Sequence, residues 1–141
     1  MIYADTSALV KRYLIEPFST EFDALLEHGT MAISRLTIVE VRCALARRRR
    51  NRDIDTLREN RVNAELAADI QAGALQVGEF DAAHFTTAYH LIGRLTDISL
   101  RTLDALHLAA AEQASATAFA TADKIQADAA EALGFTVHRF Y

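Results

Sequence analysis

Short apolar runs alternate along this chain with stretches of helical periodicity. Five runs are short and rich in apolar or β-branched residues, as buried strands are, at residues 1–4, 31–34, 75–77, 118–121 and 136–140. Helical patterns lie between them and end near Gly or Pro, at residues 7–15, 19–28, 37–50, 54–72, 81–92, from 102 onward, and from 123 to 134. Strands separated by helices of this length predict an α/β fold with a central parallel sheet and helices on both faces.

Composition supports one globular domain. The chain has 141 residues, of which 51% are hydrophobic and 24% charged, so it can build one well-packed core. No linker rich in Pro, Gly or Ser divides it, and we expect a single domain over residues 1–141. No basic flank leads into an apolar run at the N-terminus, and no run approaches the ~20 apolar residues that span a bilayer. We therefore expect a cytoplasmic protein.

Three side-chain types outside the acids have ordinary structural explanations. The lone Cys43 cannot form an internal disulfide, and its place in an apolar helical pattern predicts a packed thiol. His107 shares a helical face with Asp104, three residues earlier, and is either packed in place or a metal ligand. Six scattered aromatic residues fit core packing, at positions 18, 22, 80, 85, 89 and 119.

Four acids occupy comparable places in the predicted fold. Asp5 follows the first strand, Glu40 lies in the first turn after the second, and Asp123 follows the strand at 118–121. Asp104 begins a helix, so its placement depends on how that helix is oriented. Because loops that follow parallel strands gather at the carboxyl edge of a sheet, where ligands bind, we expect the four acids to converge there.

Each acid also has a purely structural explanation. Asp5, Asp104 and Asp123 suit helix N-termini, and Glu40 fits a Thr-x-x-Glu capping box with Thr37. However, Asp5 follows an apolar strand, where an uncompensated charge is costly. Several neighbouring carboxylates repel one another unless a cation intervenes, and all-oxygen ligands favour Mg²⁺ or Mn²⁺. Such a site suits phosphodiester hydrolysis.

Basic residues are concentrated although the net charge is −4. Eight of the fifteen lie between residues 42 and 61, including four in succession, Arg47, Arg48, Arg49 and Arg50. Successive arginines on a helix point in different directions, so a solvated face is one interpretation. Contact with an RNA backbone and contact with an acidic partner are the other two.

Four segments together resemble a known family. DTSALVKRYLIE, SRLTIVEVRCAL, LRTLDALHLAAA and FATADKIQADAAEALGFTV resemble, in order and spacing, the PIN domain of the VapC toxin ribonucleases, over almost the whole chain. The resemblance implies a PIN-like three-layer α/β/α sandwich and an endoribonuclease dependent on Mg²⁺ or Mn²⁺. It further implies the toxin half of a type II toxin-antitoxin system, a homodimer silenced by a VapB-like antitoxin protein.

The resemblance also implies roles for individual residues. Asp5, Glu40, Asp104 and Asp123 would be catalytic and would hold the metal, with Asp5 and Asp104 as the most direct ligands and Ser7 and Thr121 supporting them through their hydroxyls. Glu40 would ligate the metal or orient the attacking water. We expect hydrolysis of RNA by metal-activated water, leaving 5′-phosphate and 3′-hydroxyl ends.

Two related functions stay open. A catalytically silent PIN-like module that binds RNA or protein would keep the fold and lose the acids, whereas all four acids are present here. A structure-specific DNA nuclease usually carries extra helical insertions, for which 141 residues leave little room. A receiver domain is disfavoured because it requires an aspartate at the end of the third strand, and LQVGEF offers none.

Overall fold

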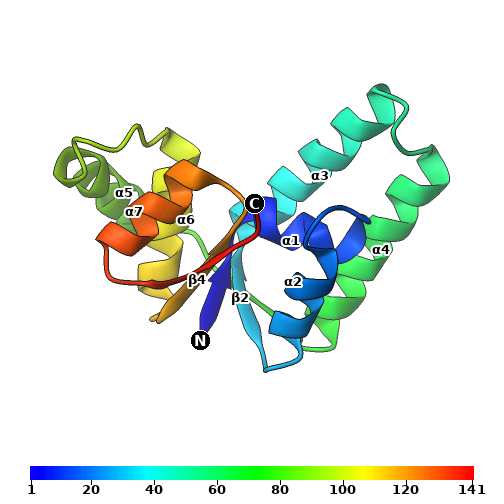
Figure 1. Ribbon diagram of the computed structural model, residues 1–141, viewed down its shortest axis with the longest axis horizontal. Coiled ribbons are helices and arrows are strands. Elements are labelled where there is room, and N and C mark those ends of the chain that lie inside the picture. The colour runs from blue at the N-terminus through cyan, green and yellow to red at the C-terminus, as the bar shows by residue number, and fades with distance from the viewer.

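Five parallel strands form one sheet at the centre of the computed structural model, which describes all 141 residues (Figure 1). The strands lie in the order β3-β2-β1-β4-β5. Their bounds are β1 Ile2–Ala4, β2 Met31–Ser34, β3 Leu75–Gly78, β4 Ala118–Thr121 and β5 Thr136–Arg139. Every neighbouring pair is parallel. The predicted central parallel sheet is therefore confirmed.

Seven helices cover the two faces of this sheet. They are α1 Thr6–Tyr13, α2 Ser19–Leu26, α3 Arg35–Arg50, α4 Thr56–Gln71, α5 Ala82–Arg94, α6 Thr102–Gln113 and α7 Lys124–Ala132. Figure 1 shows α1 to α4 on one side of the sheet and α5 to α7 on the other. This arrangement is the expected three-layer α/β/α sandwich. None of the helices is both long enough and apolar enough to cross a membrane.

Alternation along the strands builds a separate apolar core on each face. On β1, Tyr3 belongs to the core under α5, α6 and α7, whereas the next residue, Ala4, belongs to the core under α1 to α4. Phe119 and Ala120 divide in the same way on β4. Strands buried on both faces read as continuous apolar runs, and they form a rigid base for the residues that follow them.

The sheet brings the first and fourth strands side by side. Ile2 pairs with Ala118 and Ala4 pairs with Ala120. The ladder continues past the strand, because the backbone N–H of Asp5 donates to the Ala120 carbonyl at 3.1 Å. Since all strands run the same way, the residues that follow β1, β2 and β4 meet at one edge of the sheet.

Helix α3 begins earlier than the sequence pattern predicts. Ser34 is its N-cap, and the Thr37 hydroxyl accepts a hydrogen bond from the Ser34 N–H at 3.3 Å. The predicted capping box between Thr37 and Glu40 is therefore wrong. Thr37 forms the cap with Ser34, and Glu40 lies in the next turn of the helix. The Glu40 side chain takes no part in the cap and is free for other contacts.

Two expectations about packing are also wrong. Cys43 is exposed, because its position on α3 lies on a face that no other element covers. Phe22 and Phe119 are fully buried as expected, but Phe85 and Tyr89 lie on the outer face of α5 and are exposed. Apolar spacing along a helix shows that residues share a face, but it does not show which face meets the core.

Candidate functional site

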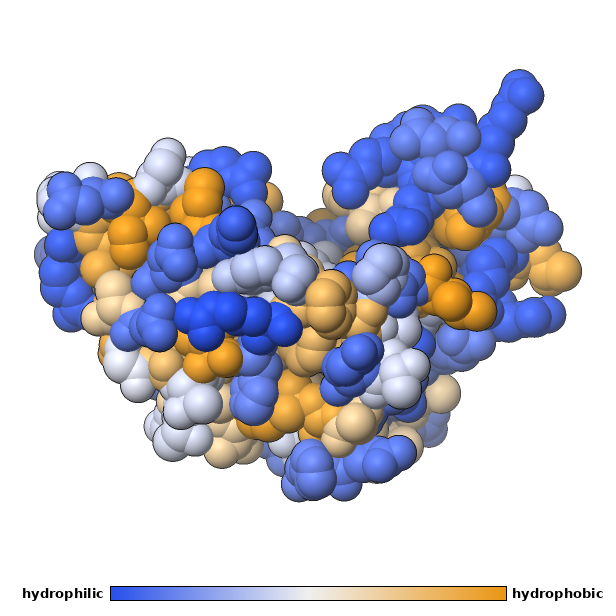
Figure 2. All heavy atoms as spheres, in the orientation of Figure 1, coloured by the Kyte–Doolittle hydropathy of each residue, from blue (hydrophilic) through white to orange (hydrophobic).

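A pocket of about 540 Å³ lies at the carboxyl edge of the sheet. It opens between α3 on one side and the first turns of α6 and α7 on the other, at the hollow visible in Figure 2. The four predicted acids all line it, on four different elements or turns. Its other polar lining residues are Thr6, Ser7, Arg47, Arg48, Arg50, Arg101 and His107, with Cys43 beside them. The four acids therefore lie at one edge of the sheet, as expected.

Asp5 lies at the floor of the pocket with only 4% of its surface exposed. One carboxylate oxygen, Oδ1, accepts hydrogen bonds from the Ser7 hydroxyl at 2.7 Å and from the Ala8 N–H at 3.0 Å. The other, Oδ2, accepts from the Thr121 hydroxyl at 2.5 Å. Burial raises the pKa of Asp5 above its ordinary value, although His107 and the three hydrogen bonds oppose this rise. A nearby cation would offset that cost.

Ser7 and Thr121 fix this carboxylate and connect two turns. The Ser7 hydroxyl accepts from the Ala122 N–H at 2.8 Å, and the Thr121 hydroxyl accepts from the Asp123 N–H at 3.0 Å. The β1–α1 turn is thereby joined to the β4–α7 turn. Asp5 is also the N-cap of α1. Its structural interpretation is therefore confirmed, and its catalytic role stays a prediction.

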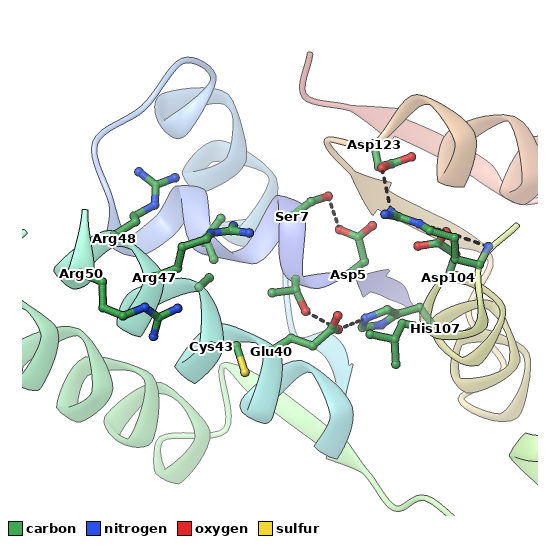
Figure 3. Close-up of a pocket in the computed structure, with 15 residues that line it drawn as sticks. Asp5, Ser7, Glu40, Cys43, Arg47, Arg48, Arg50, Asp104, His107 and Asp123 are labelled. Atoms are coloured by element: carbon green, nitrogen blue, oxygen red, sulfur yellow. Dashed lines mark hydrogen bonds and ion pairs between the residues drawn. The ribbon is translucent and has the colours of Figure 1, made fainter. Parts of the chain in front are cut away.

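Glu40 is held by a chain of hydrogen bonds that the sequence did not reveal (Figure 3). His107 Nε2 donates to Glu40 Oε1, and the Thr6 hydroxyl donates to the same oxygen at 2.9 Å. His107 Nδ1 lies 2.8 Å from the hydroxyl of Tyr3, which also contacts Ser34 at 3.0 Å. His107 is buried as expected, and it also contacts an acid of the pocket.

This chain of contacts keeps Glu40 ionised. Partial burial raises the pKa of Glu40, but the hydrogen bond and charge of His107, with help from Thr6, outweigh it and leave the pKa below its ordinary value. Both bonds end on Oε1, so Oε2 has no protein partner. The only sequence signal for the contact between His107 and Glu40 was that His107 lies three residues after Asp104, on the same helical face.

Asp104 and Asp123 share one cationic partner, Arg101. Asp104 Oδ2 accepts from the backbone N–H and from the Nε of Arg101, each at 3.1 Å. Arg101 Nη2 lies 3.7 Å from Asp123 Oδ2, while Asp123 Oδ1 caps α7 by accepting from the Gln126 N–H at 3.0 Å. Arg101 is not among the residues predicted from the sequence, although RTLD places it three residues before Asp104.

The arginine block of α3 divides around the helix. Arg47 and Arg50 line the pocket without an ion pair, and Arg48 lines it while pairing with Glu16 at 2.9 Å. Arg49 turns toward α4 and pairs with Glu59 at 2.6 Å. The block therefore has no single role, and contact of its pocket-facing members with RNA stays a prediction.

The donor set of the pocket fits a hard divalent cation. It offers four carboxylates from separate elements, and burial raises the pKa of one of them, Asp5, so a nearby cation would favour its charged form. In the present side-chain arrangement no three such groups are close enough to hold one ion together. Glu40 is paired with His107, and Asp104 and Asp123 are paired with Arg101. Metal binding therefore requires these side chains to move.

The fold and the pocket define a class of protein: a parallel α/β/α sandwich with an acidic site at the carboxyl edge of its sheet. Comparison with protein families identifies the family within this class. The family model of the PIN domain matches residues 2–132. The chain belongs to the PIN domain family. None of the curated proteins compared with the chain matches it.

Solved structures share the fold at low sequence identity. VapC20 of Mycobacterium tuberculosis, a toxin that cleaves the sarcin-ricin loop, is 17% identical, with a TM-score of 0.73 over 96% of this chain and 97% of that chain. A chain of FitAcB from Neisseria gonorrhoeae is 19% identical, with a TM-score of 0.74 over 97% and 96%. A chain of the DNA-bound VapBC2 complex of Rickettsia felis is 16% identical, with a TM-score of 0.68 over 100% of both chains.

Proposed function

We propose that the chain, as one PIN domain over residues 1–141, is a VapC-type endoribonuclease dependent on Mg²⁺ or Mn²⁺. One observation carries this proposal: four carboxylates from distant parts of the sequence line one pocket, and arginines of α3 line its other wall. Acids suit a divalent cation, and arginines suit the phosphates of the substrate. The PIN family assignment and the retention of all four acids support a nuclease over a silent binding module.

The chemistry is hydrolysis of a phosphodiester bond. A bound divalent ion would supply Lewis-acid activation of water and neutralise charge that develops on the phosphate. Asp5, Asp104 and Asp123 would hold the ion, and the hydroxyls of Ser7 and Thr121 keep the Asp5 carboxylate in one orientation. In-line attack leaves a 5′-phosphate and a 3′-hydroxyl.

Glu40 is the residue best suited to orient the attacking water. Its Oε1 is held by His107 and Thr6, so Oε2 is free to accept a proton or a hydrogen bond at a fixed place in the pocket. His107 and Tyr3 act through Glu40 and are positioning residues. Residues that position a catalytic group commonly affect the reaction rate, because they fix the orientation of that group.

The proposed biological role is the toxin of a toxin-antitoxin pair in the cytoplasm. Structures of FitAB bound to DNA and of VapBC bound to DNA from Salmonella typhimurium share the fold and support an antitoxin protein as the partner of this chain. We further propose a homodimer. The pocket presents both acidic side chains and arginines, so an antitoxin could recognise it through charges of either sign.

Cleavage of RNA tests the proposal directly. Purified protein is incubated with total RNA with and without Mg²⁺ or Mn²⁺, and the ends of the products are mapped. We expect metal-dependent cleavage that Asp5→Asn abolishes and that Asp128→Asn, an exposed acid on α7 outside the pocket, leaves unchanged. A folded Asp5→Asn variant with undiminished activity would refute the assignment, and binding of RNA without cleavage would favour the silent module.

A further inference from the structure

Arg101 occupies the open side of two acids of the pocket. Its side chain is 74% exposed, whereas the side chains of Asp104 and Asp123 are 14% and 35% exposed. Its guanidinium group contacts both, through Nε to Asp104 at 3.1 Å and through Nη2 to Asp123 at 3.7 Å. A single flexible cation therefore bridges the first turn of α6 and the N-cap of α7.

The electrostatic influence of Arg101 extends across the pocket. The hydrogen bond to Asp104, together with the charges of both acids, raises the pKa of Arg101, so the side chain stays charged. Its charge also helps to lower the pKa of Glu40, which lies on α3 at the opposite wall. Arg101 thus supplies positive charge to Asp104 and Asp123, which have no other cationic partner.

The geometry of this contact makes it easy to exchange. The helix α6 does not depend on the guanidinium, because the backbone N–H of Arg101 makes its own hydrogen bond to Asp104 at 3.1 Å. An exposed arginine can leave by rotation of its side chain alone, and exposed ion pairs of this kind are weak. A divalent ion carries twice the charge and is the stronger partner for a pair of carboxylates.

We propose that Arg101 is a built-in counterion that holds Asp104 and Asp123 until a divalent cation displaces it. This inference rests on the proposed function, because it assumes that these two acids hold the metal. Arg101 is then a positioning residue that raises the concentration of metal needed to fill the site. Replacing Arg101 with a neutral residue should then strengthen metal binding, whereas loss of a merely structural contact would weaken it or leave it unchanged.

Calorimetric titration with Mn²⁺ in the absence of RNA tests the exchange. We expect Arg101→Gln to bind Mn²⁺ about two- to fivefold more tightly than the wild type at low salt, the size expected for exposed ion pairs. Half-maximal RNA cleavage should require correspondingly less Mn²⁺. Arg101→Lys keeps the positive charge and should lie closer to the wild type than Arg101→Gln does.

Arg35→Gln is the matched control. Arg35 is also exposed and forms a paired contact with one acid, Glu79, at 2.7 Å through two nitrogens, but it does not line the pocket. Its loss changes the net charge equally and should leave Mn²⁺ affinity unchanged. Wild-type affinity in a folded Arg101→Gln, or equal tightening in Arg35→Gln, would overturn the exchange alone. A wild-type protein that neither binds Mn²⁺ nor cleaves RNA would instead overturn the proposed function.

Discussion

Replacing Asp5 with asparagine should stabilise the protein while it removes activity. Asp5 is buried, and burial leaves its pKa raised even though three hydrogen bonds and His107 favour the charged form. The charged carboxylate of Asp5 therefore lowers the free energy of unfolding. Asparagine has nearly the same shape, and its Oδ1 can still accept from Ser7 and Ala8. Its Nδ2 would face Thr121, whose hydroxyl can rotate to accept.

The size of the effect follows from two opposing contributions. Burial of an ion costs several kcal/mol, and hydrogen bonds to a charged acceptor are each stronger than neutral ones by about 1 kcal/mol. The raised pKa of Asp5 indicates that burial outweighs the bonds in this pocket. We expect a net gain of about 1–2 kcal/mol in the free energy of unfolding at neutral pH. For a chain of this length the gain corresponds to an increase in Tm of roughly 3–6 °C.

Thermal unfolding followed by circular dichroism across pH gives the measurement. A carboxyl group with a raised folded-state pKa stabilises the fold fully below its ordinary pKa and loses that contribution as the pH rises through the folded-state value. The two proteins should therefore have similar Tm values below about pH 4 and diverge as the pH rises. Glu40, whose lowered pKa has the opposite pH dependence, is present in both proteins and cancels in the comparison.

A Tm of Asp5→Asn equal to or below that of the wild type at neutral pH would refute this reasoning. The control is Asp128→Asn, because Asp128 is exposed on α7 and forms no ion pair. Its Tm should match the wild type at every pH. Stabilisation in both variants would point to net charge as the cause, since each loses one negative charge.

Two further predictions concern the walls of the pocket. His107→Gln breaks the bond that holds Glu40, so we expect a loss of about 1–3 kcal/mol in the free energy of unfolding and about 10- to 100-fold in cleavage rate, measured by urea denaturation and by RNA cleavage. Unchanged cleavage in a folded variant would remove the positioning role. The double change Arg47→Gln with Arg50→Gln should flatten the salt dependence of RNA binding by about 1.4 in the slope of log K against log [salt], whereas Arg49→Gln, which faces α4, should not. Equal effects of both sets, measured by fluorescence anisotropy, would contradict contact from the pocket wall.

Much of the fold could be predicted from local pattern. The five strands follow short apolar runs, and α5 begins within one residue of the start of the predicted helical pattern at 81–92. The start of α3 was predicted too late although the deciding contact is local, because Ser34 both ends β2 and caps the helix through Thr37. The exposure of Cys43 and Phe85 was predicted wrongly for a tertiary reason, since periodicity does not show what a helix packs against.

The sequence by itself determined the kind of fold and predicted the four acids, although the place of Asp104 depended on how α6 is oriented. Apolar runs buried on both faces require a parallel sheet with helices on each side, and an acid directly after such a run must lie at the carboxyl edge. Only the tertiary structure decided which partner each acid has. Contacts such as Glu40 with His107 join residues 67 positions apart, and Asp5 with Thr121 joins residues 116 apart. No local pattern records these pairs, because they arise only when the order of the strands brings distant turns to one edge.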